Sequence, residues 1–421
     1  MMHNEQSKNG MTVPILLGFF VIAMCFNFAS QGEEIKHEPT ILNYSCKGSA
    51  SLCRDFQKAL AYREVQKVLL DIATSPRTLE YINTALEDTS VTVADLKALD
   101  LVRHDGDRFV LAFSLFTRED MDRIRAVAEI EGKSLAEALI SKRTEIENAL
   151  ILDSPPGVDR RANAYFILGC VSLDWDGLRL AREKGYLTVP GENSYLPQAI
   201  QPGGGGSCRA LYWGSHSYHS SIAITSFGDH HQARQALPDL LWRLEVDAPE
   251  AIKADLLSVA DALIRRHVGI MMIALRDADR STAELAEAAG VTEKEAEKLI
   301  SLLLNLNYIS KLGSNYRAII PVLTDRDALM VKQLRQIGMK VMLKWFAEHY
   351  EGLSKKLAGL TPVRNGVRLS DGFYCVWHYI FGIANRELVT AGLFADPYDN
   401  EREFKGCIPA VYLFDVVTGP L

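Results

Sequence analysis

Four histidines lie close together in the middle of the chain: His216, His219, His230 and His231. Imidazole nitrogens bind zinc, copper and nickel, so this group is a candidate metal site. His216 and His219 fall in a segment of alternating character, and on a strand two residues three positions apart point to opposite faces. Neither an HExxH motif nor an acidic ligand at a metal-site spacing accompanies them. We therefore expect exposed histidines at strand ends and at a helix start, and we predict no metal or other cofactor.

Cys208 is a candidate nucleophile, because it follows the glycine run 203–206 and precedes His216 and Asp229. A thiol, an imidazole base and a carboxylate that orients the base are the parts of a cysteine hydrolase. A second cysteine in a similar context, Cys407, has no matching histidine and aspartate. We favour a buried or disulfide-bonded cysteine, because one Cys–His combination arises easily by chance. The glycine run is not a phosphate loop, since no GxxxxGK[ST] motif follows.

The chain contains seven cysteines and no CxxC motif, which excludes a zinc ribbon and a thioredoxin-type redox site. Cys46 and Cys53 are close enough in the sequence to close a small disulfide loop if the chain is exported. In a reducing compartment both would remain thiols, and the sequence favours neither outcome.

Aromatic residues are concentrated in two later segments of the chain. Aromatic side chains with a few polar atoms suit a ligand groove or a partner surface, but more often they form the core of a small domain. The residues concerned are Tyr165, Phe166, Tyr212, Trp213, Tyr218, Phe373, Tyr374, Trp377 and Tyr379.

The segment 281–327 contains the elements that would position any contact with nucleic acid. Residues 282–289 predict a short helix ended by a glycine. Thr292 and Glu295 then form a capping-box pattern at the start of a longer amphipathic helix. Two strands follow, with a turn at Gly313 between them. This order of elements resembles the winged helix-turn-helix family; the resemblance implies a fold and, by itself, no activity.

An earlier segment repeats this pattern. Its apolar, glycine and aromatic positions coincide with those of the later one: Leu99, Leu101, Val102, Gly106, Phe109, Phe113 and Leu115 align with Leu306, Tyr308, Ile309, Gly313, Tyr316, Ile320 and Val322. Residues 117–120 and 324–327 then carry the same [ST]-x-x-D helix start. The resemblance continues in residues 165–173 and 373–383, and in residues 206–212 and 406–412. We therefore predict two tandem units.

In DNA-binding winged helices, the third helix and the hairpin that follows it contact the DNA. If the two units were used in this way, seven basic side chains would face the DNA. They are Lys97, Arg103 and Arg108 in the first copy, and Lys294, Lys298, Lys311 and Arg317 in the second. Acidic residues lie among them: Asp95, Asp100, Asp105, Asp107, Glu293, Glu295 and Glu297. Neither third helix is clearly basic, so we favour packing or protein binding over DNA reading.

The apolar run 11–29 bears on the compartment. It is long enough for the core of a signal peptide, and Ser30 and Gly32 are small residues placed for cleavage before Glu33. An uncleaved membrane anchor and a buried core helix are the alternatives. Too few lysines and arginines flank the run to fix an orientation. We expect a periplasmic, secreted or membrane-anchored protein. If the run is an anchor whose following chain stays on the inner side of the membrane, the protein would face the cytoplasm.

The chain of 421 residues is 48% hydrophobic and has a net charge of -7, which suits several packed domains and argues against a dedicated polyanion binder. We expect an α+β fold with this organisation: a signal or anchor (1–32), a linker (33–54), a winged-helix unit with a helical arm (55–153), an α/β cap (154–250), a second winged-helix unit with its arm (254–361) and a second cap (362–421). The predicted function is a non-catalytic exported or membrane-tethered binding protein with a protein or peptide partner. A DNA-binding transcriptional regulator is the alternative, and a cysteine- or metal-dependent hydrolase the third.

Overall fold

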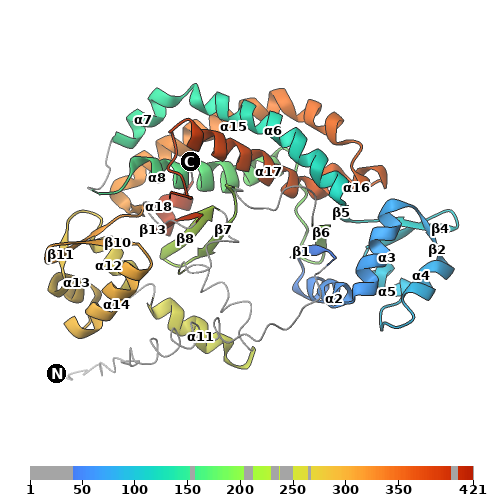
Figure 1. Ribbon diagram of the computed structural model, residues 1–421, viewed down its shortest axis with the longest axis horizontal. Helices are drawn as coiled ribbons and strands as arrows, with labels where there is room; N and C mark the ends of the chain where they lie inside the picture. The colour runs from blue at the N-terminus through green and yellow to red at the C-terminus, as the bar shows by residue number, and fades with distance from the viewer. Residues whose placement is uncertain are drawn as a thin grey trace, which may run out of the picture.

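The computed structural model describes residues 41–151, 157–202, 212–228, 237, 250–263, 267–399 and 406–420. The fold is α+β, with helices forming most of the described chain and four small sheets lying among them. Two lobes stand at opposite ends of an arch of helices (Figure 1). Within the described ranges, no helix combines the length and apolar character needed to cross a membrane. The expected signal or anchor, 1–32, lies outside these ranges.

The first lobe combines helices with a three-stranded antiparallel sheet. Its elements are α2 (Ala50–Leu60), α3 (Arg63–Thr74), β2 (Arg77–Thr78), α4 (Leu79–Ala85), α5 (Val93–Ala98), β3 (Val102–Asp105) and β4 (Arg108–Leu111). The central strand is β4, with β2 and β3 on either side. Thr92 and Asp95 form a capping box at the start of α5. The β3–β4 hairpin turns at Gly106, whose φ of 66° is a conformation that favours glycine.

The second lobe contains the same elements in the same order. They are α12 (Gly269–Ala274), β9 (Arg280–Ser281), α13 (Thr282–Ala289), α14 (Glu293–Asn305), β10 (Ile309–Leu312) and β11 (Asn315–Ala318), and the separate helix α11 (Glu250–Leu263) precedes them. The central strand is β11, flanked by β9 and β10. The predicted capping box of Thr292 and Glu295 begins α14, and the predicted glycine, Gly290, ends α13 with a φ of 64°.

The backbone repeats one unusual feature in both lobes. Among the described residues, two non-glycine residues have a positive φ: Asp100 at 45° and Asn307 at 57°. Each follows the end of a third helix, α5 or α14, directly before the hairpin. Asp and Asn tolerate this conformation better than most residues. A hairpin therefore follows the third helix in both lobes, with Gly106 and Gly313 at equivalent turns.

Two further sheets lie beneath the arch and have related topologies. Their strands are β1 (Asn43–Gly48), β5 (Ser114–Phe116), β6 (Tyr195–Ile200), β7 (Ser215–Tyr218), β8 (Ile222–Gly228), β12 (Val322–Leu323) and β13 (Cys407–Leu413). Strand β6 is antiparallel to β1 and parallel to β5. Strand β13 is antiparallel to β8 and parallel to β12. Thus β6 and β13 hold equivalent places in their sheets.

These strands change two expectations. Residues 41–54, expected to be part of a linker, contain β1 and the beginning of α2, because β1 pairs with β6 over its whole length. The sequence comparison matched 406–412 with 206–212, but the strand in the place of β13 is β6, at 195–200. Residues 203–211 themselves lie outside the described ranges.

The arch is built from both long and short helices. They are α6 (Arg118–Ile140), α7 (Arg143–Ile151), α8 (Arg160–Ala164), η1 (Tyr165–Asp176), α9 (Gly177–Glu183), α15 (Ala328–Leu357), α16 (Thr361–Arg364) and α17 (Leu369–Thr390), with the short helices η3 (Asp325–Asp327) and α18 (Phe414–Thr418) beside them. The element η1 is a π-helix that continues α8 and leads into α9 without a break. The segment 165–173, for which strand and buried helix were both open, is therefore helical.

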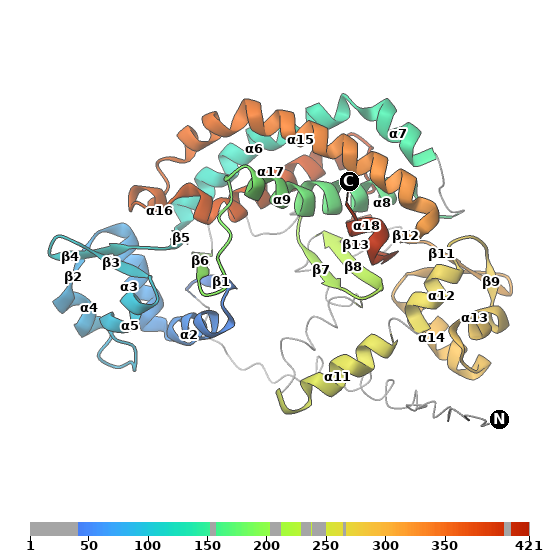
Figure 2. The same ribbon diagram turned by 180° about the vertical axis from the view of Figure 1, so that it is seen from behind.

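Helices from the two halves of the chain interleave in the arch. Helix α6 packs along α17, and α15 packs along η1 and α6 (Figures 1 and 2). Glycines permit the close approach of α6 to α17 and of α15 to η1. A Cβ at Gly132 of α6 would lie 2.6 Å from the carbonyl oxygen of Ile380 in α17, and a Cβ at Gly338 of α15 would collide with Ser172 in η1.

The buried apolar residues form two cores. One fills the first lobe and includes Leu42, next to β1, and Ala199 on β6. The other runs without interruption from the arch through the β8–β13 sheet into the second lobe. The second lobe is therefore part of the main body, whereas the first lobe has a core of its own.

Candidate functional site

The three candidate cations of the first lobe are exposed on α5, β3 and β4. Arg103 donates a hydrogen bond from Nη2 to the carbonyl oxygen of Asn365 at 2.6 Å, which ties the hairpin to the end of α16. Arg108 donates from Nη1 to the carbonyl oxygen of Pro76 at 3.3 Å. Lys97 lies on the exposed side of α5. Two of the three cations thus contact the protein's own backbone.

The four candidate cations of the second lobe fall into two groups. Lys294, Lys298 and Lys311 are exposed on α14 and β10. Arg317 on β11 donates two hydrogen bonds to the carboxylate of Asp279, at 2.7 and 2.8 Å. These bonds hold the pKa of Asp279 below its usual range, as expected for a carboxylate that accepts from a guanidinium. Arg317 is therefore committed to an ion pair within the lobe.

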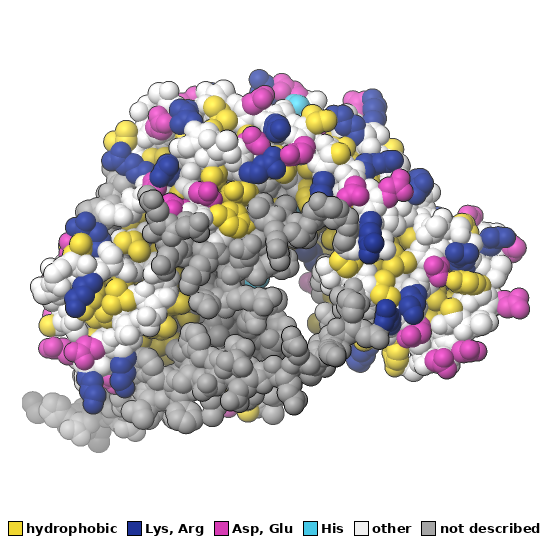
Figure 3. All heavy atoms as spheres, in the orientation of Figure 1, with side chains coloured by type: hydrophobic (Ala, Val, Ile, Leu, Met, Phe, Trp, Pro, Cys, Tyr) yellow, Lys and Arg dark blue, Asp and Glu magenta, His cyan; other side chains and the backbone are white. Residues whose placement is uncertain are grey.

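Acidic side chains are mixed with these cations on both lobes. On the face shown in Figure 3, Lys and Arg alternate with Asp and Glu over the lobes and the arch. Exposed acids on or directly beside the third helices and the hairpins in the chain are Asp95, Asp100, Asp105, Asp107, Glu293 and Glu297. Surfaces that bind DNA concentrate positive charge, because phosphate contacts supply much of the affinity.

The histidine candidates are only partly described. His216 lies on β7, and His219 lies just beyond the end of that strand. The ring of His219 packs near Trp175 and Phe414, with centroids 6.2 and 5.3 Å apart. His230 and His231 lie outside the described residues. Within the described part of the chain, no group of three or more His, Cys, Asp or Glu side chains could hold a metal ion.

The cysteine-hydrolase candidates Cys208 and Asp229 also lie outside the described residues. Cys407, the related cysteine, is buried at the start of β13 opposite Gly228. Cys170 and Cys375 are buried as well, and burial raises the pKa of the Cys170 thiol well above its usual value. A nucleophilic thiol needs access and an ionised sulfur, and burial works against both.

A disulfide joins Cys46 on β1 to Cys53 on α2, with the Cα atoms 5.6 Å apart. This separation lies within the usual range for such bonds. Of the two outcomes that the sequence left open, the structure has the bonded one. The bond fixes β1 against α2 next to Lys47.

The aromatic candidates separate into core residues and residues at a boundary. Tyr165, Phe166, Phe373 and Trp377 are completely buried and belong to the main core. Tyr212, Trp213 and Tyr218 are half-buried and pack against that core, and Tyr379 is 4% exposed. Tyr374 is half-buried, and the ammonium of Lys47 on β1 lies over its ring.

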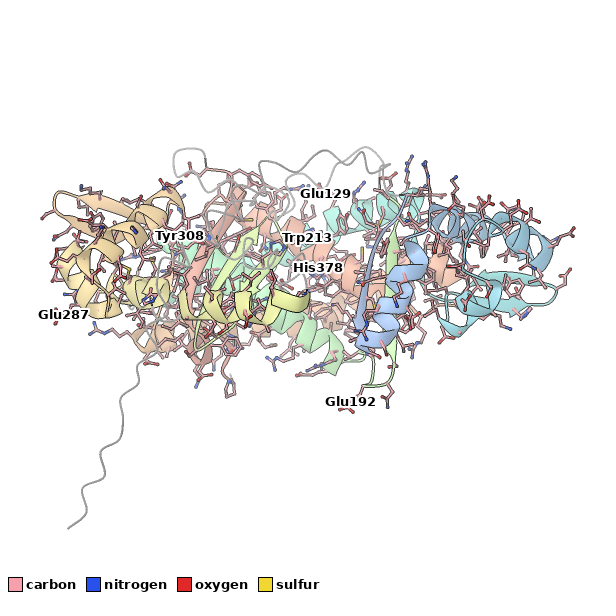
Figure 4. All side chains as sticks on the ribbon, turned by 90° about the horizontal axis from the view of Figure 1, so that it is seen from below. Glu129, Glu192, Trp213, Glu287, Tyr308 and His378 are labelled. Carbon is pink, nitrogen blue, oxygen red and sulfur yellow. A yellow bond between two sulfur atoms is a disulfide. The ribbon has the colours of Figure 1, made fainter. Side chains whose placement is uncertain are left out.

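Four titratable side chains meet where β1 approaches the arch, and the sequence singled out only Tyr374 among them, as an aromatic candidate. They are Lys47 on β1, Asp174 on η1, and Tyr374 and His378 on α17, here called the Lys47 cluster. The Lys47 Nζ lies 3.0 Å from the centroid of the Tyr374 ring. The His378 Nε2 lies 3.7 Å from Asp174 Oδ1, and its Nδ1 lies 2.7 Å from the Tyr374 carbonyl oxygen. Trp213 borders the cluster beside His378, with ring centroids 5.1 Å apart (Figure 4).

The charges of the Lys47 cluster influence one another. Asp174 is 4% exposed, and burial raises the pKa of its carboxyl to about 7, against the attraction of Lys47. Lys47 is exposed as a residue, but its ammonium end is crowded against the Tyr374 ring. This local desolvation lowers the pKa of Lys47 to about 8, against the attraction of Asp174. Burial, then the Asp174 charge, raises the pKa of the Tyr374 hydroxyl.

The cluster was missed because its members lie in segments interpreted in other ways. Lys47 fell in the expected linker, Asp174 directly follows the apolar run 165–173, and His378 lies inside the related segment 373–383. One local signal was present. A charged or titratable residue inside a run of buried positions is uncommon and needs a partner.

Comparison of the chain with protein-family models, with curated proteins and with solved structures finds no match, so its function is inferred from the geometry above.

Proposed function

We propose that this chain is a non-catalytic binding protein in which two winged-helix modules engage a protein or peptide partner. One observation carries the proposal: the same order of helices, strands and hairpin recurs at both ends of the arch, with mixed charge over both third helices. A repeated module offers two related surfaces to one partner. Mixed charge suits a protein surface better than a polyanion.

The matching backbone details support a tandem duplication. Asp100 and Asn307 share a positive φ at equivalent positions, as do Gly106 and Gly313. The sheets that contain β6 and β13 also combine one parallel and one antiparallel pairing in the same arrangement. In this proposal each unit comprises a winged helix, helices of the arch and a strand of one central sheet.

The proposed location is outside the cytoplasm, as an exported or membrane-tethered protein. The Cys46–Cys53 disulfide supports it, because such bonds persist in oxidising compartments. The apolar run 11–29 would supply the signal or the anchor. A reporter fused after Leu421 should be active only in a format that requires export. Strong activity of a cytoplasm-only reporter behind the intact N-terminus would reject this location.

A DNA-binding regulator is the second candidate, favoured by the two exposed lysines of α14, Lys294 and Lys298. One arch that carries two winged helices would also present two third helices to one ligand, as a dimeric regulator does. Titration with DNA at several salt concentrations separates the two proposals. A protein-binding role predicts weak binding without sequence preference and with a steep salt dependence.

Two variants make this titration quantitative. Lys294→Ala and Lys298→Ala should each reduce the salt slope by about one unit at most, because each removes one phosphate contact. Arg317→Ala is the matched control, since Arg317 is paired with Asp279 and should leave the slope unchanged. A preference of about a thousandfold for one DNA sequence at physiological salt would favour the regulator and reject the protein-binding proposal.

A further inference from the structure

The Lys47 cluster has the composition of a site for an organic cation. An ammonium group is attracted to the face of an aromatic ring and more strongly to a carboxylate that has lost its water. Both features converge here, on the Tyr374 ring and the Asp174 side chain. We propose that this cluster is a binding site for a primary alkylammonium ligand, and that the chain's own Lys47 occupies it in this structure.

The aromatic side of the site is formed by several rings in contact. The Lys47 Nζ lies 3.0 Å from the Tyr374 centroid, well within the range of about 6 Å for an attractive cation–ring contact. The Tyr374 ring lies 4.1 Å from that of His378, and Trp213 lies 6.0 Å from Tyr379. Since α17 supplies three of these four rings and is packed into the main core, the site is held in place before a cation arrives.

The acidic side of the site is Asp174, near the end of η1. A buried carboxylate is costly unless a cation or several donors compensate it. His378 approaches Asp174 at 3.7 Å, which is longer than a hydrogen bond. Lys47 attracts Asp174 over a longer distance. Its charge lowers the pKa of Asp174, and the charge of Asp174 raises the pKa of Lys47. A second positive charge placed like that of Lys47 would gain the same attraction.

The route to the site follows the Lys47 side chain. Lys47 is exposed as a residue and belongs to β1, which lies at one edge of its sheet. Its stem therefore enters the cluster from solvent, and an external alkylammonium can take the same path once the side chain leaves. The neighbouring backbone is held independently, by the Cys46–Cys53 disulfide and by Gly48, which fits closely against Ser194.

Replacing Lys47 tests the proposal directly. Lys47→Ala removes three methylene groups and the ammonium, and 1-propylammonium has the same number of carbons and the same ammonium, with a methyl at its free end. At about pH 8.5, above the pKa of about 7 that Asp174 has beside Lys47, the variant should bind 1-propylammonium in calorimetry and gain thermal stability from it. The neutral isostere 1-propanol should bind at least ten times more weakly. The wild type should also bind 1-propylammonium at least ten times more weakly, because Lys47 competes.

Two further substitutions test the two sides of the site. Adding Asp174→Asn or Tyr374→Leu to Lys47→Ala should weaken 1-propylammonium binding at least tenfold. In the single variant, affinity should also fall as the pH is lowered, because protonation removes the Asp174 charge while the ligand stays charged. The pKa of Asp174 is about 7 beside Lys47, and the loss of Lys47 raises it further, so the fall should begin above pH 7. Affinity that does not change with pH or with Asp174→Asn would overturn the assignment.

A folding control keeps the result interpretable. Lys47→Thr truncates the side chain with a residue that favours strands, and it replaces Lys47→Ala if that variant does not fold. A folded variant that binds 1-propylammonium no better than 1-propanol would reject the site. A wild type that binds as tightly as the variant would reject occupation by Lys47.

Discussion

Arg335 and Asp176 form a buried ion pair between α15 and the end of η1. The two side chains are 6% and 5% exposed, and Arg335 donates two hydrogen bonds of 2.9 Å to the carboxylate. Removing one partner leaves a buried charge with much less compensation. Arg335→Met should therefore lower the free energy of unfolding by about 3 kcal/mol, the lower end of the usual range, because Arg179 also pairs with Asp176.

A pair on the surface of the same helix is the control for this prediction. Lys355 and Glu351 are 2.6 Å apart but 74% and 85% exposed. Lys355→Met should change the unfolding free energy far less than Arg335→Met does, because water screens the pair. Chemical denaturation measures both variants. Equal losses in the two would mean that burial does not determine the strength of the Arg335 contact.

Residue-level features were predictable where their cause is local. The capping boxes of Thr117 with Asp120 and of Thr292 with Glu295 are formed within four residues, and both are present as expected. The contact between Lys47 and Tyr374 depends on how β1 is placed beside α17. No local pattern encodes that placement, so neither residue stood out as a cation site.

At the scale of elements, small residues set how closely the arch helices cross. Gly132→Ala and Gly338→Ala would each place a methyl group against the neighbouring helix, at Ile380 and Ser172. Each substitution should lower the unfolding free energy by about 1–3 kcal/mol, as overpacking does, despite the higher helix propensity of alanine. Thermal or chemical unfolding would show the loss.

Gly352 provides a matched control on α15. Nothing lies within 4 Å of a Cβ built at this exposed position. Gly352→Ala should therefore stabilise the protein, by up to about 1 kcal/mol. If Gly132→Ala also stabilised it, the close crossing of α6 and α17 would not be needed in solution.

The elements differ in how much the sequence revealed. The third helices and hairpins were predicted because amphipathic spacing, capping residues and turn glycines agree over a short stretch. Residues 165–173 gave no such agreement, since a continuous apolar run fits a buried strand or a buried helix equally well. The π-helix formed there packs against α15 and α17, which follow much later in the chain, so the local sequence lacks that part of its environment.

At the scale of the whole molecule, the arch ties the two halves of the chain together. Helix α6 needs α17, and η1 needs α15, to cover their apolar faces. The sequence predicted the order of elements but not this exchange of helices between the two halves. Helices of similar halves can pack either within their own half or against the other half. Linear periodicity is the same in both cases.

This arrangement predicts complementation between fragments. Residues 1–202 and 212–421, produced together as separate chains, should copurify and recover one cooperative unfolding transition. Alone, the first fragment should retain at most its own lobe, which has a separate core. Two fragments that fold cooperatively alone and do not associate would contradict the exchange of helices. Calorimetry and size-exclusion chromatography would distinguish these outcomes.

The same exchange has a consequence for how the protein is made. Helix α6 ends at Ile140, whereas its partner α17 begins at Leu369. Ribosomes add about 5–20 residues per second, so roughly 10–50 s separate the emergence of the two helices. During that interval the apolar face of α6 lacks α17, its most extensive partner, and for most of it lacks α15 as well. We expect the nascent first half to depend on chaperones until nearly the whole chain has been synthesised.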